Sequence, residues 1–224
     1  MAQGISEVLV YAVGVAITLS AIIAVILLLF SERARVNGLV FLLGWVLGLA
    51  LISGLAYVLG DQANPSTSTS ASDKIAWGKI VFGVLFLLLA MRTWRNRPPT
   101  GTQSEMPKWA SGIAAMTPVK AFGLAVLLAA VNPKNLMLSL AAGAGLAALG
   151  LSTGDALGSL LVYIIVGSLT VAVPVVYYLT GGDAAKARLT EMKTWLAIHN
   201  AAVTAVVFLI LGADLIAKGL PPLT

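Results

Sequence analysis

The sequence predicts an all-α integral membrane protein with six transmembrane helices, arranged as two inverted repeats of three helices each. Only 10% of the 224 residues carry a charge, against roughly 25% in soluble domains. Hydrophobic residues make up 59% of the chain, and they gather in six runs that approach the roughly 20 residues a helix needs to cross a bilayer. This composition excludes an ordinary soluble enzyme, a disordered chain and a nucleic-acid binder.

The first half of the chain, residues 1–97, is expected to hold the first repeat. Its apolar runs predict spans at about 8–30, 38–59 and 77–94. The first run is too long for the core of a signal peptide, and no basic residue precedes it, so we expect a retained span. The third run is short, and Lys79 is expected to extend its amine toward the outer surface.

The second half, residues 118–224, is expected to hold the second repeat, with spans at about 118–149, 157–179 and 195–216. A basic, proline-containing segment, residues 98–117, is predicted to be a cytoplasmic linker between the halves. Residues 183–194 are charged and helical in composition, so we expect them at the membrane interface. Because three is odd, two three-span halves insert in opposite orientations, an arrangement common in secondary transporters.

The basic residues predict the orientation of the chain. One set falls in the connections between spans 1 and 2, 3 and 4, and 5 and 6: Arg33, Arg35, Arg92, Arg95, Arg97, Lys108, Lys186, Arg188 and Lys193. The opposite side holds fewer: Lys74, Lys79 and Lys218. The positive-inside rule therefore predicts a multi-pass protein of the cytoplasmic (inner) membrane with both termini outside.

The fourth apolar region is too long for one straight span. As a continuous helix, residues 118–149 would extend about 48 Å, whereas the hydrocarbon core is about 30 Å thick. The sequence Asn132-Pro133 interrupts the region. Proline ends or kinks a helix that reaches it, and Asn followed by Pro suits the start of a new helix. The fourth span is therefore predicted to be broken at Asn132-Pro133.

Lys134 brings a positive charge to this break. It lies at the start of the second half-helix, where the helix dipole disfavours cations, and insertion scales give a cost of about 2.5–3.5 kcal/mol at the membrane centre. An anionic partner is therefore expected, either Asp214, Asp61 or Glu7, or else a substrate. The alternative is a plain kink with Lys134 extended to water. The predicted substrate-binding residues at the break are Asn132, Pro133, Lys134 and Asn135.

Four other polar residues within spans are weaker candidates. Thr18 and Ser20 are expected to line a substrate path, or else to bond their own helix backbone. Asp214 is a candidate for ion coupling or for pairing with Lys134, and its alternative is a local pair with Lys218. His199 is a candidate for coupling, or else a packed interfacial side chain. With no cysteine, metal-ligand cluster or nucleotide-binding motif, no catalytic residue, metal or cofactor is predicted.

The sequence Asn132-Pro133-Lys134-Asn135 in a six-span chain resembles the second-half motif of the lysine-exporter (LysE) superfamily. More narrowly, residues 31–38 and 41–48 are similar to the GAP family, the peptidoglycolipid-addressing or Sap-type proteins of mycobacteria and related actinobacteria. The resemblance implies export across the inner membrane and a role in delivering glycolipids to the cell envelope. Superfamily members usually carry proline in the first span, where this chain reads Leu19-Ser20-Ala21-Ile22, so a matching break is not predicted there.

Together, these features predict a secondary exporter rather than an enzyme. Its substrate is expected to be an anionic or zwitterionic solute or an envelope glycolipid precursor, moved by alternating access around the broken helix. The alternatives are an accessory subunit of a lipid-export machine that itself transports nothing, and an amino-acid exporter like LysE. The expected partners are the lipid bilayer, the substrate, a second copy in a homodimer, and envelope-lipid export machinery.

Overall fold

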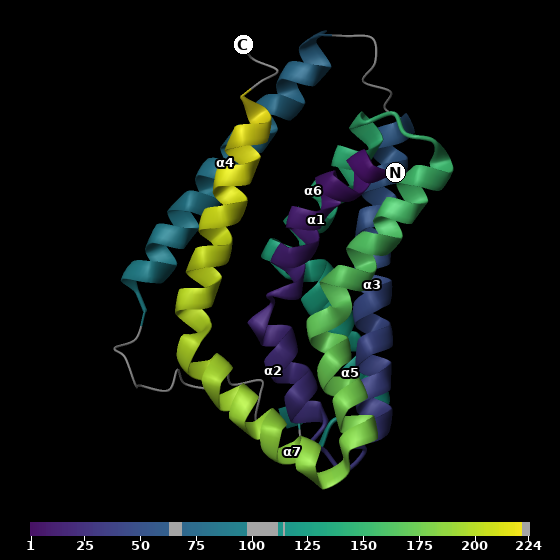
Figure 1. Cartoon of the computed structure of the whole chain (residues 1–224), viewed down its shortest axis with the longest axis vertical. Helices are drawn as coiled ribbons and strands as arrows, with labels where there is room; N and C mark the ends of the chain where they lie inside the picture. Colours follow the sequence, from purple (N-terminus) through teal and green to yellow (C-terminus); the bar gives the residue numbers. More distant parts are fainter. Residues whose placement is uncertain (63–68, 98–111, 114, 221–224) are drawn as a thin grey trace.

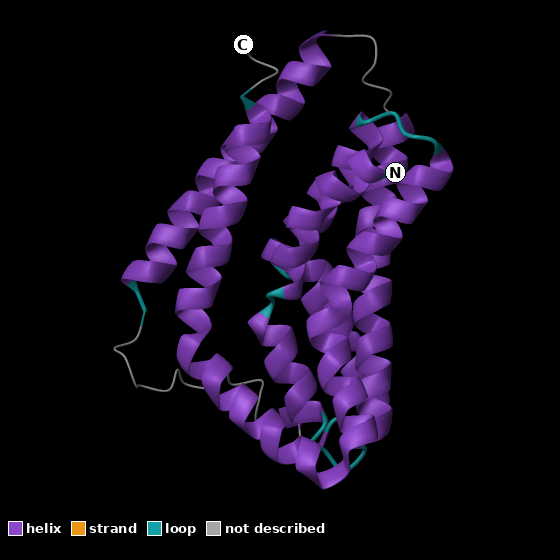
Figure 2. Cartoon of the chain, in the orientation of Figure 1, coloured by secondary structure: helices purple, strands orange, loops and turns teal. Residues whose placement is uncertain are grey.

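The protein is helical throughout the part that the structure describes. This computed structural model describes residues 1–62, 69–97, 112–113 and 115–220, and Figure 2 shows its helices joined by short loops. The helices in chain order are α1 (Ala2–Ala16), α2 (Leu19–Leu28), α3 (Ala34–Gln62), α4 (Thr69–Arg95), α5 (Pro118–Val126), the π-helix η3 (Leu127–Val131), α6 (Pro133–Ala148) and α7 (Thr153–Gly219).

Four to six stretches of helix are candidate membrane spans by length and composition. Four qualify alone: Ala34–Asp61, Trp77–Arg95, Thr153–Gly181 and Ala201–Gly219. Two more qualify if each of two bent helix pairs counts as one span. The first pair is α1 with α2, bent by 54°, and the second is Pro118–Val131 with α6, bent by 62°. The predicted break at Asn132-Pro133 is therefore confirmed.

The first span is broken as well, which the sequence did not predict. α1 ends at Ala16 and α2 begins at Leu19, so the break falls at Ile17 and Thr18 without any proline. The Ile17 backbone leaves the helical region, with φ −84° and ψ 50°, and Thr18 is extended. Both halves of the chain therefore begin with a broken helix pair.

The structure corrects the expectation of separate helices after the fourth span. The predicted segments 157–179, 183–194 and 195–216 all belong to α7, one continuous helix of 67 residues. Residues 184–194 contain no glycine or proline, and most of them are good helix formers, so nothing in this stretch ends the helix. In Figure 1, α7 descends, turns at the lower end and returns upward, so that one helix holds two candidate spans. Most of the predicted linker 98–117 lies outside the described residues.

The ends of the elements sort to two sides of the molecule. The start of α1 and the end of α7 lie toward the upper end in Figure 1, whereas the junction of α2 with α3 and the turn of α7 lie at the lower end. Those lower positions carry basic side chains, including Arg33 and Arg188. These basic side chains therefore lie at the end of the molecule opposite the start of α1 and the end of α7.

Large aromatic side chains fill the interior, and leucines cover the outside. Trp45, Tyr11 and Tyr163 are fully buried, and the Trp45 indole Nε1 donates a hydrogen bond to the Gly167 carbonyl at 3.3 Å. Exposed leucines recur on α3 at every fourth position, which is one helix face: Leu39, Leu43, Leu47, Leu51 and Leu55. An apolar outer face of this extent is suited to contact with lipid.

Candidate functional site

The two broken helix pairs meet at their breaks. The Thr18 hydroxyl, from the first break, contacts Asn135 Oδ1, from the second, at 2.8 Å. The Lys134 amine reaches the same part of the first pair and donates to the carbonyls of Gly14 at 3.0 Å and Ile17 at 2.9 Å. Thr18 and Asn135 are buried. We call the residues around these contacts, 14–18 and 132–135, the crossing.

Lys134 finds its partner in the backbone, not in a side chain. The last carbonyls of a helix receive no hydrogen bond from the backbone of that helix. They form the negative end of the helix dipole, where a cation is stabilised. Among the described residues no ion pair joins Lys134 to a carboxylate, so the expected pairing with Asp214, Asp61 or Glu7 is not found. The amine instead binds the carbonyl end of α1. Sequence reasoning missed this partner because it did not place a helix end there.

Threonines bind the remaining free carbonyls of α1. The Thr18 hydroxyl lies 2.6 Å from the Val15 carbonyl and shares its single proton between that carbonyl and Asn135 Oδ1. The Thr170 hydroxyl of α7 donates to the Ala16 carbonyl. With Lys134 on the other two, all four terminal carbonyls of the half-helix have side-chain partners. This arrangement satisfies backbone groups that would otherwise be unpaired inside the membrane.

The second break is organised by two asparagines. Asn132 caps α6, because its Oδ1 accepts a hydrogen bond from the Lys134 backbone N–H at 3.1 Å, as expected of an Asn before Pro. The buried Asn135 side chain donates from Nδ2 to the Leu128 carbonyl at 2.8 Å. Leu128 lies in η3, whose wide turn leaves carbonyls without their usual helical partners. The Asn135 side chain thus connects α6 to η3 across the second break and also contacts Thr18 at the first break.

The Lys134 amine has hydrogen-bonding capacity left over at the crossing. The two carbonyls that hold the Lys134 amine are neutral, and an ammonium group has a third proton to donate. In addition, α2 begins at Leu19, and its N-cap residue Thr18 makes no side-chain cap hydrogen bond, so the positive end of the helix dipole lies at the break. Ser20, the second residue of α2, is half-buried, and its side chain makes no hydrogen bond within the described residues. The crossing is therefore suited to an anionic group.

An apolar pocket adjoins the crossing. It has a volume of about 220 Å³ and lies between α1 and the returning part of α7. Gly14 and Ile17, whose carbonyls bind Lys134, form part of its wall. The remaining wall is aliphatic: Leu9, Val10, Val13, Val207, Ile210 and Leu211. A charged polar centre thus lies beside a hydrocarbon-lined space.

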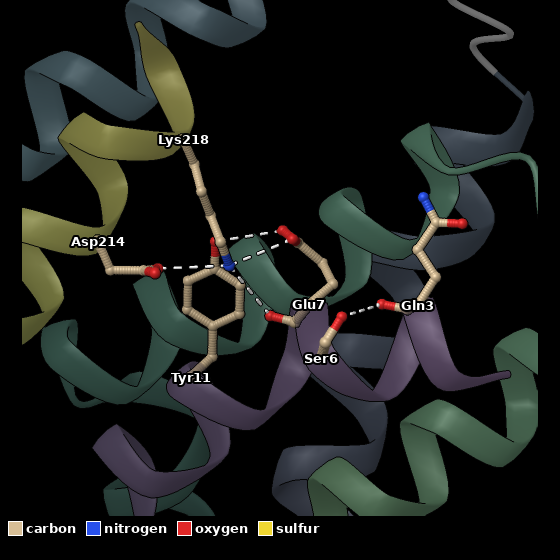
Figure 3. A network of polar contacts seen from close by, with 6 residues as sticks. All are labelled: Gln3, Ser6, Glu7, Tyr11, Asp214 and Lys218. Carbon is tan, nitrogen blue, oxygen red and sulfur yellow. Dashed lines mark hydrogen bonds and ion pairs between the residues drawn. The ribbon is translucent and has the colours of Figure 1, made fainter. Parts of the chain in front are cut away.

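Asp214 belongs to a separate ionic cluster near the chain termini. Lys218 pairs with Asp214 at 3.3 Å and with Glu7 at 3.2 Å, and Figure 3 shows its amine between the two carboxylates and above the Tyr11 ring. The Tyr11 hydroxyl donates to Glu7 Oε1 at 3.4 Å. We call Glu7, Tyr11, Asp214 and Lys218 the outer cluster. The local alternative for Asp214, a pair with Lys218, is therefore present, and Glu7 extends it to α1.

His199 does not join either group. Its Nδ1 lies 2.8 Å from the Trp195 carbonyl, and its ring stacks on the Trp195 ring with centroids 4.4 Å apart. Both contacts are within one turn of α7.

Thr170, which binds the Ala16 carbonyl, was not among the residues that the sequence singled out. Its only sequence signal is a threonine within an apolar run, which also fits a bond to its own helix.

Comparison with known proteins identifies the family. Residues 8–221 match the model of the family described as Sap, sulfolipid-1-addressing protein. The chain belongs to the Sap family. This confirms the family resemblance noted in residues 31–48 and 132–135, and the family description names no enzyme. No curated protein and no solved structure matches the chain.

Proposed function

We propose that this Sap-family chain is a secondary exporter of the cytoplasmic membrane that moves an anionic envelope lipid or its precursor. The observation that carries the proposal is the crossing, in which Lys134 of one broken helix holds the carbonyl end of the other. Broken helices that meet inside a membrane are where transporters place their substrate sites. Alternating access would then be a rearrangement of the two pairs about this point.

The architecture supports two inverted halves of the chain. In our proposal residues 1–97 form one half and 118–224 the other, joined by a cytoplasmic linker, 98–117. Each half begins with a broken pair and continues with two unbroken candidate spans. Six spans place both termini on the same side, and the basic residues at the opposite end favour the cytoplasm for that end.

The chemistry beside the crossing favours a lipid over an amino acid. A positive centre suits a sulfate, phosphate or carboxylate, while the adjoining pocket is walled by aliphatic side chains. An amphiphile satisfies both requirements, whereas the charged backbone of a free amino acid would leave the pocket unused. The family description names sulfolipid-1, and we extend to this chain the class of anionic lipid.

The distribution of lipids in cells tests this function. Cells that lack the chain are compared with the parent and with a complemented strain, and surface lipids are extracted separately from total lipids. We expect one anionic lipid to fall at the surface while its total amount is retained, because synthesis continues without export. Normal surface lipids together with accumulation of an amino acid inside the cell would contradict the proposal and favour a LysE-like exporter.

A reconstituted system separates an exporter from an accessory subunit. The purified chain is placed in vesicles that contain the lipid identified in cells, with a proton gradient applied across the membrane. Movement of that lipid between leaflets, above the rate in protein-free vesicles, is the expected result. No movement, together with capture of a larger export complex from cells by crosslinking, would favour the accessory role.

A further inference from the structure

A second cavity lies away from the crossing, between α4 and α6. Its volume is about 240 Å³, and its wall includes Phe82 and Phe86 of α4, Met137, Ala141 and Ala144 of α6, and Leu215 of α7. α4 packs mainly against the returning part of α7. Figure 1 shows this helix pair standing beside the rest of the bundle. The cavity therefore separates the α4–α7 pair from the helices that form the crossing.

The shape of the α6 wall leaves room for a chain-like ligand. Ala141, Ala144, Gly145 and Ala148 lie on one face of α6 and all line the cavity, so small side chains face the aromatic rings of α4. Phe82 is 44% exposed although it points to this cavity. A dry apolar cavity of about 150 Å³ already binds benzene. Hydrocarbon, rather than water, is therefore the occupant that the wall selects.

One cation lies on the wall of the same cavity. Lys79 is half-buried and lines it, and it forms no ion pair or hydrogen bond with any of the described residues. It is two residues inside the candidate span Trp77–Arg95, which is the end nearer the chain termini. Lipid headgroups lie at this depth. By contrast, the charge of Lys218 in the nearby outer cluster is already shared between Glu7 and Asp214.

The outer cluster fixes the neighbouring edge of the cavity. Tyr11 belongs both to the cluster and to the cavity wall, and the Lys218 amine lies 5.0 Å from its ring centre. The Glu7 carboxylate packs against Gly145, where an added Cβ would come within 2.7 Å of Glu7 Oε1. With those groups committed to one another, Lys79 is the wall residue with a charge to offer a ligand.

We infer that this cavity binds an acyl chain of an anionic membrane lipid, whose headgroup contacts Lys79. The site is distinct from the crossing, and the inference holds whether or not the crossing transports a substrate. Lipid bound there would lie between the α4–α7 pair and the rest of the bundle, in contact with both.

Photo-crosslinking of a lipid tests the inference. The purified full chain is reconstituted in phosphatidylcholine vesicles that contain phosphatidylglycerol with a diazirine near the end of one acyl chain. After irradiation, labelled residues are mapped by mass spectrometry, and the same diazirine on phosphatidylcholine serves as the neutral probe. We expect labelling at Met137, Ala144 and Phe82 above the background set by Leu47 and Leu51, which face outward on α3.

Two variants and one control sharpen the result. Ala144→Phe fills the cavity and should reduce labelling of α6 by both probes, whereas Ala213→Phe, at an exposed position outside the wall, should not. Lys79→Met should lower labelling by the anionic probe about five-fold, as expected for one lysine near a lipid headgroup, and leave the neutral probe unchanged. The labelling pattern of the wild-type protein needs no variant, so it tests the acyl-chain site even if Ala144→Phe fails to fold.

The outcomes separate the two parts of the inference and the proposed function. Labelling of α6 no stronger than that of α3, or no loss in a folded Ala144→Phe variant, would overturn the acyl-chain site. Equal labelling by both probes, unaffected by Lys79→Met, would overturn the anionic headgroup. Specific labelling that persists in a variant unable to export lipid would support this site while leaving the crossing responsible for transport.

Discussion

At the residue scale, the first break depends on side chains that come from far along the sequence. Lys134 and Thr170 bind carbonyls at the end of α1 from positions more than 100 residues away. The sequence singled out Lys134 because a buried charge needs a partner, and the structure places Lys134 where the two breaks meet. Sequence reasoning misjudged the partner, because no local signal marks a helix end at Ile17.

The contact between Thr18 and Asn135 makes a prediction about stability. Asn135→Ala leaves the Leu128 carbonyl without its donor, and we expect a loss of about 1–3 kcal/mol in the free energy of unfolding. A double-mutant cycle with Thr18→Val should give a coupling of about 0.6 kcal/mol, with an upper bound near 1.7 kcal/mol. Reversible unfolding in mixed detergent measures both quantities.

Ser20→Ala is the matched control for this cycle. Ser20 lies in α2, two residues after Thr18, and its side chain makes no hydrogen bond in the described part of the chain. Its substitution should therefore change the free energy of unfolding by less than about 0.5 kcal/mol. Strictly additive effects of Thr18→Val and Asn135→Ala would show that the two breaks are not coupled through this contact.

At the element scale, the second break was predictable and the first was not. Asn132-Pro133 carries a local cause, since proline removes an amide donor and Asn caps the next helix. The first break has no proline, and its cause is tertiary. The continuity of α7 was also missed, because a change from apolar to charged residues marks a membrane boundary without marking the end of a helix.

Close packing of α6 on α3 gives a prediction for two glycines. A Cβ at Gly143 would come within 3 Å of backbone atoms of α3, at Ser53 and Tyr57, whereas Gly123 in α5 has no atom within 4 Å. Gly143→Ala should therefore destabilise the protein by about 1–3 kcal/mol. Gly123→Ala should stabilise it by up to about 1 kcal/mol, because Ala favours helix.

Thermal unfolding of the two variants in the same detergent checks this pair. Both substitutions raise helix propensity by the same amount, so a difference in the sign of the stability change reports the difference in packing. A gain of stability in Gly143→Ala would mean that α3 and α6 do not approach as closely as the structure shows.

At the scale of the whole molecule, the positions of charge and helix ends favour the orientation that we propose. Basic side chains such as Arg33 and Arg188 lie where α2 joins α3 and α7 turns, at the end opposite the start of α1 and the end of α7. The composition predicted a membrane protein, and the order of the residues predicted where the apolar runs lie. Neither predicted the two separate spaces beside the bundle, one next to the crossing and one next to Lys79, because both are formed by helices distant in sequence.

The absence of cysteine from the sequence allows a clean test of orientation. Single cysteines are introduced at Gln3, near the start of α1, and at Asn96, after the end of α4. In intact cells a membrane-impermeant maleimide should label Gln3→Cys, and Asn96→Cys should react only after lysis. The reverse pattern would invert the orientation, and equal labelling of both positions would contradict the three spans expected between Gln3 and Asn96.

We propose that export requires the positive charge of Lys134 at the crossing. Lys134→Gln keeps amide donors for the carbonyls of Gly14 and Ile17 but removes the charge, and Lys120→Gln, at an exposed position of α5, is the matched control. Each variant is expressed in cells that lack the chain, its folding is checked by size-exclusion chromatography, and surface lipid is compared with total lipid. We predict that Lys134→Gln is folded yet leaves surface lipid at the level of the deletion, while Lys120→Gln restores it. Full restoration by folded Lys134→Gln would contradict the claim.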